Sequence, residues 1–434
     1  MAARRRGASP APRAEPALSG FSGDESSDAA PARGATKALT PGQTKKAESK
    51  LSKVRTRLLF GTPMIGAFFG LVWLGHPYMV LLVCILQVGL FRELVNVRYR
   101  PAKEREVPLF RTIQWAMFVV AMTHVYGRVF VKLGLAHSAA ERLPSVLAGA
   151  LTQTIKYHRL ISFASYVATF IGFVLSLRPG LYKYQIGNTV WTVGVLALVV
   201  WQIAGTTELI FAGLVWFMLP CGLVVANDCW AYFSGVAMGK RFIKAPFLAL
   251  SPNKTWEGFI GGFFLTVVWG WWYADQIAKL QWLVCPQKNL DPFASLSCTP
   301  ASLFEKQKIP IPHKELEIFT VTARPFQLHA SLLAVFASVV APFGGFLASA
   351  IKRAYNIKDF DSLIPGHGGF MDRMDCQFLM LLGTNVWYRT FVRAYDDLSE
   401  EDLLVVIRAM VPSARATLLD KLLKEFNCTG SCFA

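Results

Sequence analysis

The sequence predicts an all-α, polytopic membrane protein with about nine transmembrane helices. Of its 434 residues, 53% are hydrophobic and 17% are charged, whereas a soluble chain carries nearer a quarter charged. Mean hydropathy is +0.38. The apolar residues gather in runs long enough to cross about 30 Å of hydrocarbon. These runs lie at about 58–75, 78–95, 111–134, 160–178, 188–206, 209–230, 257–278, 329–350 and 376–394.

The composition divides the chain into four parts. Residues 1–56 are rich in Ala, Pro, Ser, Gly, Arg and Lys, which predicts a disordered basic tail. Lys and Arg crowd the end of this tail, so we expect it to be cytosolic. Residues 57–206 form the N-terminal transmembrane helices, and residues 207–395 hold the remaining spans with two charged loops. Residues 396–434 contain an amphipathic segment expected to pack on the membrane surface or on the protein.

The distribution of charge indicates a topology and a class of partner. If the N-terminal tail is cytosolic, counting the spans places the charged loops on the cytosolic side, where the positive-inside rule expects them. The same count places loop 279–328 on the opposite side of the membrane. Cys285 and Cys298 share that loop, where a disulfide is possible if the loop is luminal.

The net charge of +17 favours anionic headgroups or an anionic substrate. No basic stripe is interleaved with aromatic residues, which argues against a nucleic-acid partner.

The loop at 349–375 carries the densest cluster of ionisable residues, and charge at a membrane edge indicates a functional site. Asp372 and Asp375 are three residues apart, so their carboxylates share one face of a helix. Two carboxylates together with substrate phosphates are the usual way in which proteins hold Mg²⁺. The simpler alternative is a helix-start acid favoured by the macrodipole, which accounts for one carboxylate but not for two.

A glycine-rich turn precedes those two acids. Gly368 and Gly369 are expected to expose backbone amides to a phosphate at the start of a helix. His367 could donate to a phosphate, transfer a proton or fix the turn. Further charged side chains suited to phosphates are Lys352, Arg353, Lys358, Asp359 and Arg373.

The loop that follows residue 227 forms the other charged motif. Asp228 ends an apolar run, where a carboxylate needs a cation or metal partner, although an acid at a helix end beside a Lys is the simpler alternative. In the stretch that follows, Ser251 is expected to cap a helix, with Lys254 and Glu257 on one face. Two interpretations stay open: a capped helix with a surface ion pair, or Lys254 and the helix-start amides holding a phosphate.

Taken together, these motifs resemble those of the phosphatidate cytidylyltransferases, also called CDP-diacylglycerol synthases, and of their eukaryotic members in particular. The resemblance spans roughly residues 55–395 and rests on NDCWAY, SPNKTWEGFIGG, PFGGFLAS and the 349–375 motif. Two positions depart from the family pattern. Asp361 stands where the family usually has a small residue, and Gly345 stands where many bacterial relatives carry an acid used in metal binding.

The resemblance implies transfer of CMP from CTP to phosphatidate, giving CDP-diacylglycerol and pyrophosphate. It implies Mg²⁺, with room for a second, monovalent cation, phosphatidate held in the bilayer, and a homodimer. It further implies an endoplasmic reticulum membrane and an active site facing the cytosol. The implied metal ligands are Asp228, Asp372 and Asp375, and Lys254 and His367 join them as catalytic residues. The implied substrate-binding residues are Ser251, Thr255, Glu257, Lys352, Arg353, Lys358, Asp359, Gly368, Gly369 and Arg373.

Other functions fit parts of the same pattern. A CTP-dependent lipid kinase, or a cytidylyltransferase for another lipid phosphate, would use similar residues and differ in its products. A transporter would use intramembrane charges for ion passage, but the charges here cluster at one face and no inverted repeat of broken helices is evident. A scaffold that has lost activity is disfavoured because the motif acids and bases are present, Gly345 apart.

Overall fold

The computed structural model describes residues 41–99, 106–107, 109–132, 145–245, 247–248, 251, 254–287, 297–310, 320–363, 368–393, 407 and 412–425. Contacts divide the chain after Ser52, and in the first unit the described residues are the start of helix α1. The helices that precede the first charged loop are α1 (Pro41–Leu74), α2 (His76–Asn96), α4 (Phe110–Lys132), α6 (Ser145–Lys156), α7 (His158–Leu175), α8 (Tyr182–Leu196), η1 (Ala197–Trp201), α9 (Thr206–Ala212) and α10 (Val215–Met238). After it come α11 (Trp256–Ile277), α12 (Gln281–Val284), η2 (Ser302–Phe304), α13 (Pro325–Val339), α14 (Pro342–Ala354), α15 (Met371–Trp387), η3 (Tyr388–Val392) and α17 (Pro412–Glu425).

The predicted helical class is confirmed. Each predicted apolar run lies on a helix or a pair of helices, and within the described residues the only sheet is the hairpin of β1 (Gln307–Pro310) and β2 (Thr320–Ala323). Its strands are antiparallel, with Gln307 opposite Ala323. The boundaries differ in places. Residues 41–56, predicted to be disordered, form the first turns of α1, while residues 1–40 lie outside the described residues.

Two predicted spans are each divided between two helices. The run at 209–230 breaks at Gly213, whose φ of 143° is accessible to glycine and strained for other residues. A side chain there would also meet the backbone oxygen of Val284, at 2.8 Å from its Cβ. The run at 329–350 breaks between α13 and α14, where Pro342 begins the second helix.

Several helices are long and apolar enough to span a bilayer, which supports a membrane protein. By length and composition, the described residues contain five such segments, Arg55–Leu74, His76–Asn96, His158–Leu175, Tyr182–Ala212 and Pro325–Ala354. Helix α10 carries Asn227 and Asp228, and α11 is rich in Gly and Trp, residues that lower mean hydropathy. The count of about nine therefore stays a prediction.

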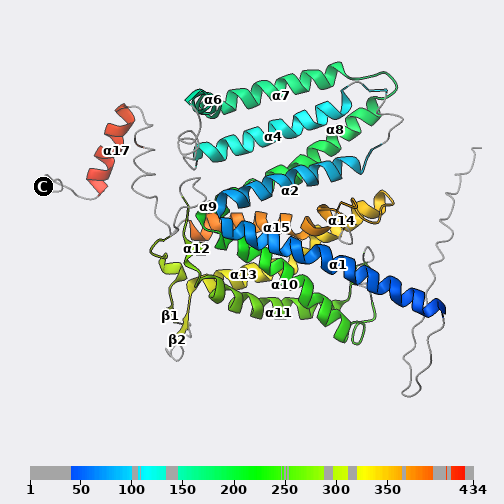
Figure 1. Ribbon diagram of the computed structural model, residues 1–434. Coiled ribbons are helices and arrows are strands. Elements are labelled where there is room, and N and C mark those ends of the chain that lie inside the picture. The colour runs from blue at the N-terminus through cyan, green and yellow to red at the C-terminus, as the bar shows by residue number, and fades with distance from the viewer. Residues whose placement is uncertain are drawn as a thin grey trace, which may run out of the picture. The chain divides into compact units, whose positions relative to one another are not determined.

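Helix contacts define two groups (Figure 1). Helix α10 packs against α11, α13 and α15, and α15 packs against α14. Helix α4 packs against α6, α7 and α8, and α8 in turn contacts α2. Small residues bring α10 and α11 close together, since a Cβ at Gly258 would lie 2.9 Å from the backbone oxygen of Ala231.

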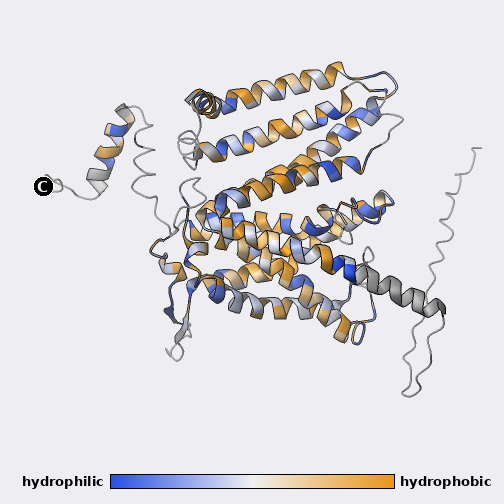
Figure 2. Cartoon of the chain, viewed as in Figure 1, coloured by the Kyte–Doolittle hydropathy of each residue, from blue (hydrophilic) through white to orange (hydrophobic). Residues whose placement is uncertain are grey.

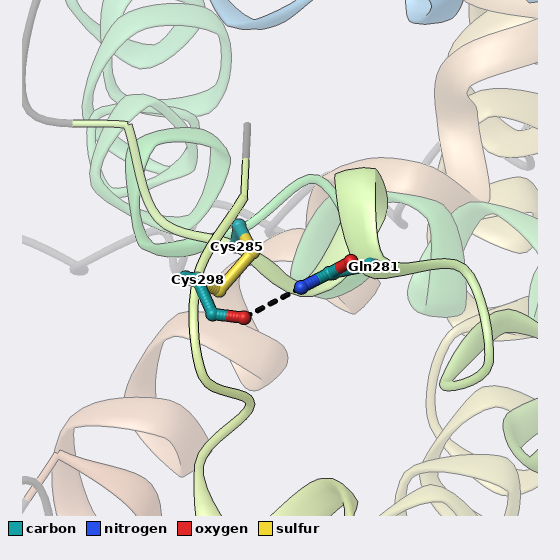
Figure 3. Close-up of a disulfide and its surroundings, with 3 residues drawn as sticks. All are labelled: Gln281, Cys285 and Cys298. Carbon is teal, nitrogen blue, oxygen red and sulfur yellow. Dashed lines mark hydrogen bonds between the residues drawn. A yellow bond between two sulfur atoms is a disulfide. The ribbon is translucent and has the colours of Figure 1, made fainter. Parts of the chain in front are cut away.

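The predicted outer loop is fastened to the helices beside it. Cys285 and Cys298 form a disulfide, and the Gln281 side chain donates to the Cys298 backbone oxygen at 2.6 Å (Figure 3). At the end of the loop, the Arg324 side chain contacts Asp275 of α11 at 3.1 Å and donates to the Phe304 backbone oxygen. These contacts fix the loop between α11 and α13.

Hydropathy follows the pattern expected of helices in lipid. Figure 2 shows apolar residues along most of the helices and hydrophilic residues toward helix ends and the hairpin. Large apolar side chains on α1, α7 and α11 are exposed, including Trp73 at 79%, Leu175 at 79% and Val268 at 69%. In a bilayer such side chains face acyl chains. In the predicted C-terminal segment, α17 begins at Pro412, and most of residues 394–411 lie outside the described residues.

Candidate active site

Asp372 joins three parts of the second charged motif. It lies in the first turn of α15, and its Oδ1 is 2.9 Å from the Nζ of Lys352 on α14. Its Oδ2 accepts hydrogen bonds from the backbone amides of Phe360, at 3.1 Å, and Gly369, at 3.0 Å. The side chain is only 9% exposed. Asp372 therefore holds the motif loop against both helices.

The glycine-rich turn is described from Gly368 onward. Gly368 has a φ of 81°, and a Cβ there would lie 2.9 Å from the Oδ2 of Asp372. The amide of Gly369, predicted to face a phosphate, donates instead to Asp372. His367 lies outside the described residues, so its predicted role stays a prediction.

Asp375 lies one turn further along α15, at the contact with α14. A Cβ at Gly345 would be 3.2 Å from the Oδ2 of Asp375, so the position of the missing family acid adjoins this carboxylate. The Oδ1 accepts from the backbone amide of Cys376 at 2.8 Å. Burial raises the pKa of the Asp375 carboxyl above its usual range. A cation bound beside Asp375 would favour the charged form of the carboxyl and oppose this effect of burial.

Asp228 and Lys254 line a cavity of about 300 Å³ between α10, α11 and α14. Asp228 lies within electrostatic reach of Lys254, Asp375 and Arg373, so the two predicted motifs meet here. The Lys254 ammonium stands over the ring of Phe346, 4.7 Å from its centroid. The alternative of a helix-end acid for Asp228 is wrong, because α10 continues to Met238. The other wall residues are mainly apolar and aromatic, Ala231, Tyr232, Val236, Phe247, Phe259 and Pro342.

The start of α11 differs from the prediction. Thr255, not Ser251, caps the helix, with its hydroxyl accepting from the amide of Gly258 at 3.1 Å. Of the two interpretations left open for this stretch, the surface ion pair of Lys254 with Glu257 is wrong. The buried carboxylate of Glu257 accepts from three backbone amides, those of Lys240 at 3.2 Å, Phe242 at 3.0 Å and Ile243 at 2.7 Å. Glu257 thus shapes the loop that follows α10, and its predicted substrate role stays a prediction.

Some predicted residues are not brought to the two acids. Arg353, Lys358 and Asp359 are exposed at or beyond the end of α14, and no contact with Asp372 or Asp375 is formed among the described residues. Ser251 bridges to Leu248 within its own loop. Their roles in binding substrate therefore remain predictions about a loaded state.

Sequence reasoning missed one residue, Glu93 of α2. Its side chain is 2% exposed, and its two oxygens accept from the amides of Phe370 at 2.7 Å and Met371 at 2.9 Å. A Cβ at Gly369 would lie 2.7 Å from its Oε2, which accounts for glycine there. Glu93 thus caps the helix that carries both motif acids. The available signal was a single carboxylate inside an apolar run, which by itself marks a functional position.

The carboxylates fit a metal ion only in part. Among the described residues, no group of three or more His, Cys, Asp or Glu side chains is placed to hold a metal ion. Asp372 is engaged by an ammonium and two amides. Asp228 and Asp375 lie within electrostatic reach of each other, and neither forms a side-chain ion pair among the described residues. Two such carboxylates suit Mg²⁺, which takes its other ligands from phosphates and water.

Comparison with known proteins agrees with the motifs. Residues 55–391 match the cytidylyltransferase family. A probable phosphatidate cytidylyltransferase of Dictyostelium discoideum is 38% identical over 80% of this chain and 73% of its own length. Phosphatidate cytidylyltransferase 3 of Arabidopsis thaliana is 38% identical over 83% of this chain and 75% of its own. Phosphatidate cytidylyltransferase 1 of Homo sapiens is 38% identical over 82% of this chain and 76% of its own length.

Proposed function

The chain belongs to the cytidylyltransferase family, and from this premise we propose how its own residues carry out phosphatidate cytidylyltransferase chemistry. The enzyme transfers CMP from CTP to phosphatidate and releases pyrophosphate. A phosphate oxygen of phosphatidate attacks the α-phosphorus of CTP and forms the new P–O bond. The bond from that phosphorus to the bridging oxygen of the β-phosphate breaks, and the bridging oxygen leaves with pyrophosphate. Both substrates are strongly anionic, so the protein must position them and neutralise their charge.

The observation that carries the proposal is the cavity lined by Asp228 and Lys254, with Asp375 of α15 within electrostatic reach of both. Lys254 supplies a positive charge to the phosphates there, and its place over Phe346 fixes the ammonium. Asp228 and Asp375 would hold Mg²⁺, which when bound neutralises phosphate charge. Lys352 reaches the same region through Asp372 and orients it. The apolar and aromatic wall of the cavity suits the glycerol and acyl end of a lipid.

We also propose the membrane setting. The charged motif loops lie at the ends of apolar helices, which supports a lipid phosphate meeting a soluble nucleotide at the membrane boundary. The excess of Lys and Arg in these loops supports a cytosolic active site. An endoplasmic reticulum location, a homodimer and a second, monovalent cation remain predictions from the family resemblance.

The proposal is tested with the purified full-length chain in mixed micelles of detergent, phosphatidate and phosphatidylcholine. CTP labelled at the α-phosphate is supplied with Mg²⁺, with or without a chelator. We expect chelator-sensitive transfer of label to the lipid phase and an equal release of pyrophosphate. Labelled CDP in the aqueous phase with phosphorylated lipid would indicate a kinase instead, and absence of any conversion would favour the transporter or scaffold.

Two variants test the assignment of the acids. We expect Asp375→Asn and Asp372→Asn each to abolish turnover, the first by removing a metal ligand and the second by releasing the motif loop. Asp420→Asn, an exposed acid on α17, is the matched control and should retain wild-type turnover. Wild-type activity in Asp375→Asn would overturn its role as a metal ligand.

A further inference from the structure

A second cavity, of about 420 Å³, lies between the end of α2, the start of α8 and the end of α14. Its polar lining consists of Arg98 and Tyr99, Lys183 and Tyr184, and Tyr355. No residue assigned above to catalysis, substrate or metal lines it. The cavity therefore needs an explanation of its own.

Two cations of this cavity have charge available for a ligand. The Arg98 Nη1 donates to the backbone oxygen of Gly187 at 3.0 Å, which uses one of the five N–H groups of the guanidinium and fixes it against α8. Lys183 is exposed. None of the ion pairs formed among the described residues includes Arg98 or Lys183. Two such cations facing one space attract an anion.

The aromatic walls are held in place before any ligand arrives. The ring of Tyr184 stacks on Phe110, with centroids 5.8 Å apart, and the ring of Tyr355 packs against Trp191 at 5.7 Å. The Trp191 indole in turn donates to the backbone oxygen of Leu94 on α2 at 2.9 Å. The three helices around the cavity are thus joined by side chains, and a ligand would not have to order them.

The position of the cavity identifies the class of ligand. It opens at helix ends, and α2 and the segment Tyr182–Ala212 are both apolar enough to span a bilayer. Tyrosines at such a boundary are typical of the membrane interface. Basic cavities between transmembrane helices at that depth bind anionic headgroups. We propose that Arg98 and Lys183 bind the phosphate of an anionic phospholipid in a site separate from the catalytic cavity.

An occupant of this site would adjoin the catalytic elements. Glu93 of α2 lies five residues before Arg98, and Lys352 of α14 lies three residues before Tyr355. At the rise of about 1.5 Å per residue in a helix, these intervals correspond to roughly 7.5 and 4.5 Å along the helix axes. The lipid would therefore contact the same two helices that hold α15 and its acids in place.

The test measures binding of a non-substrate lipid, so its outcome does not depend on turnover. Full-length protein in mixed micelles of detergent and phosphatidylcholine is titrated with radiolabelled phosphatidylglycerol, and retained lipid is counted after removal of free micelles. We expect saturable binding to the wild type, with affinity reduced about tenfold or more in Lys183→Glu and in Arg98→Ala with Lys183→Ala. Lys183→Glu changes an exposed side chain, so it tests the site even if loss of the Arg98 contact unfolds the double variant.

A matched control removes the same charge from the same helix ends. Arg92→Ala with Arg178→Ala neutralises two exposed cations that do not line the cavity, and it should bind as the wild type does. An equal loss in this control, or unchanged binding in Lys183→Glu, would overturn the proposal. Displacement of the labelled lipid by inorganic phosphate or CTP at low concentration would show that the site takes a soluble phosphate, which would overturn the lipid assignment.

Discussion

Replacement of Glu93 gives the sharpest test of how the site is assembled. The substitution Glu93→Leu keeps a side chain of similar length and removes both acceptors from the start of α15. The amides of Phe370 and Met371 would then lack their partner at a helix start, where no intrahelical acceptor exists. The acids at 372 and 375 follow directly, so their positions depend on this cap.

The magnitude follows from the two hydrogen bonds. A bond to a charged group contributes about 1.5–3 kcal/mol, so losing both should destabilise the protein by about 3 kcal/mol or more. Glu93→Gln retains one acceptor and should lose roughly half of that. Because a displacement of about 1 Å can cost a hundredfold in rate, we expect turnover in Glu93→Leu to fall by about that factor.

Both quantities can be measured on one preparation. Thermal unfolding in micelles reports stability, and pyrophosphate release at saturating CTP and phosphatidate reports turnover. Glu305→Leu removes an exposed carboxylate from the outer loop and should leave both unchanged. If Glu93→Leu kept the wild-type midpoint and turnover, the cap would be incidental and the reasoning refuted.

Three further predictions concern other parts of the molecule. Lys254→Ala should raise the KM for CTP at least tenfold, since it removes a cation from the cavity, and unchanged kinetic constants would contradict its role. Gly369→Ala should lower turnover, because the added Cβ would lie 2.7 Å from the Glu93 carboxylate that caps α15. The control Gly149→Ala adds a Cβ with nothing within 4 Å and should leave turnover unchanged. Cys285→Ser should lower the free energy of unfolding by about 3 kcal/mol, because it removes a disulfide whose cysteines are 13 residues apart. A thiol reductant would break the same disulfide in the wild type, so the two proteins should then unfold with the same free energy.

The fold class and the motif acids could be predicted because both depend on local pattern. Runs of apolar residues locate helices, since a backbone in lipid must satisfy its own hydrogen bonds. Asp372 and Asp375 are set three apart on a helix, and Asp228 lies within electrostatic reach of Asp375 because α10 packs on α15. The spacing in the sequence predicted that Asp372 and Asp375 share a helix face, and the family resemblance predicted that Asp228 lies close to the motif acids.

The misplaced details depend on contacts between distant segments. The spacing of Glu257 from Lys254 suggested an ion pair, but the loop after α10 folds back and donates three backbone amides to the Glu257 carboxylate. Thr255 caps α11 because the chain is still extended at that residue, with φ −109° and ψ 153°. Glu93 was overlooked because its partners lie 277 and 278 residues further along the chain. No window of sequence contains both ends of such a contact.

That separation has a consequence for how the protein is made. Glu93 enters the membrane with the second helix, long before the ribosome has synthesised the amides that will receive it. During this interval its carboxylate has no native partner, and a charge within the bilayer is costly. A nascent chain that stops before α15 would therefore carry an unsatisfied acid in α2. Chains truncated there should be recognised and degraded, so that only completed chains accumulate in the membrane.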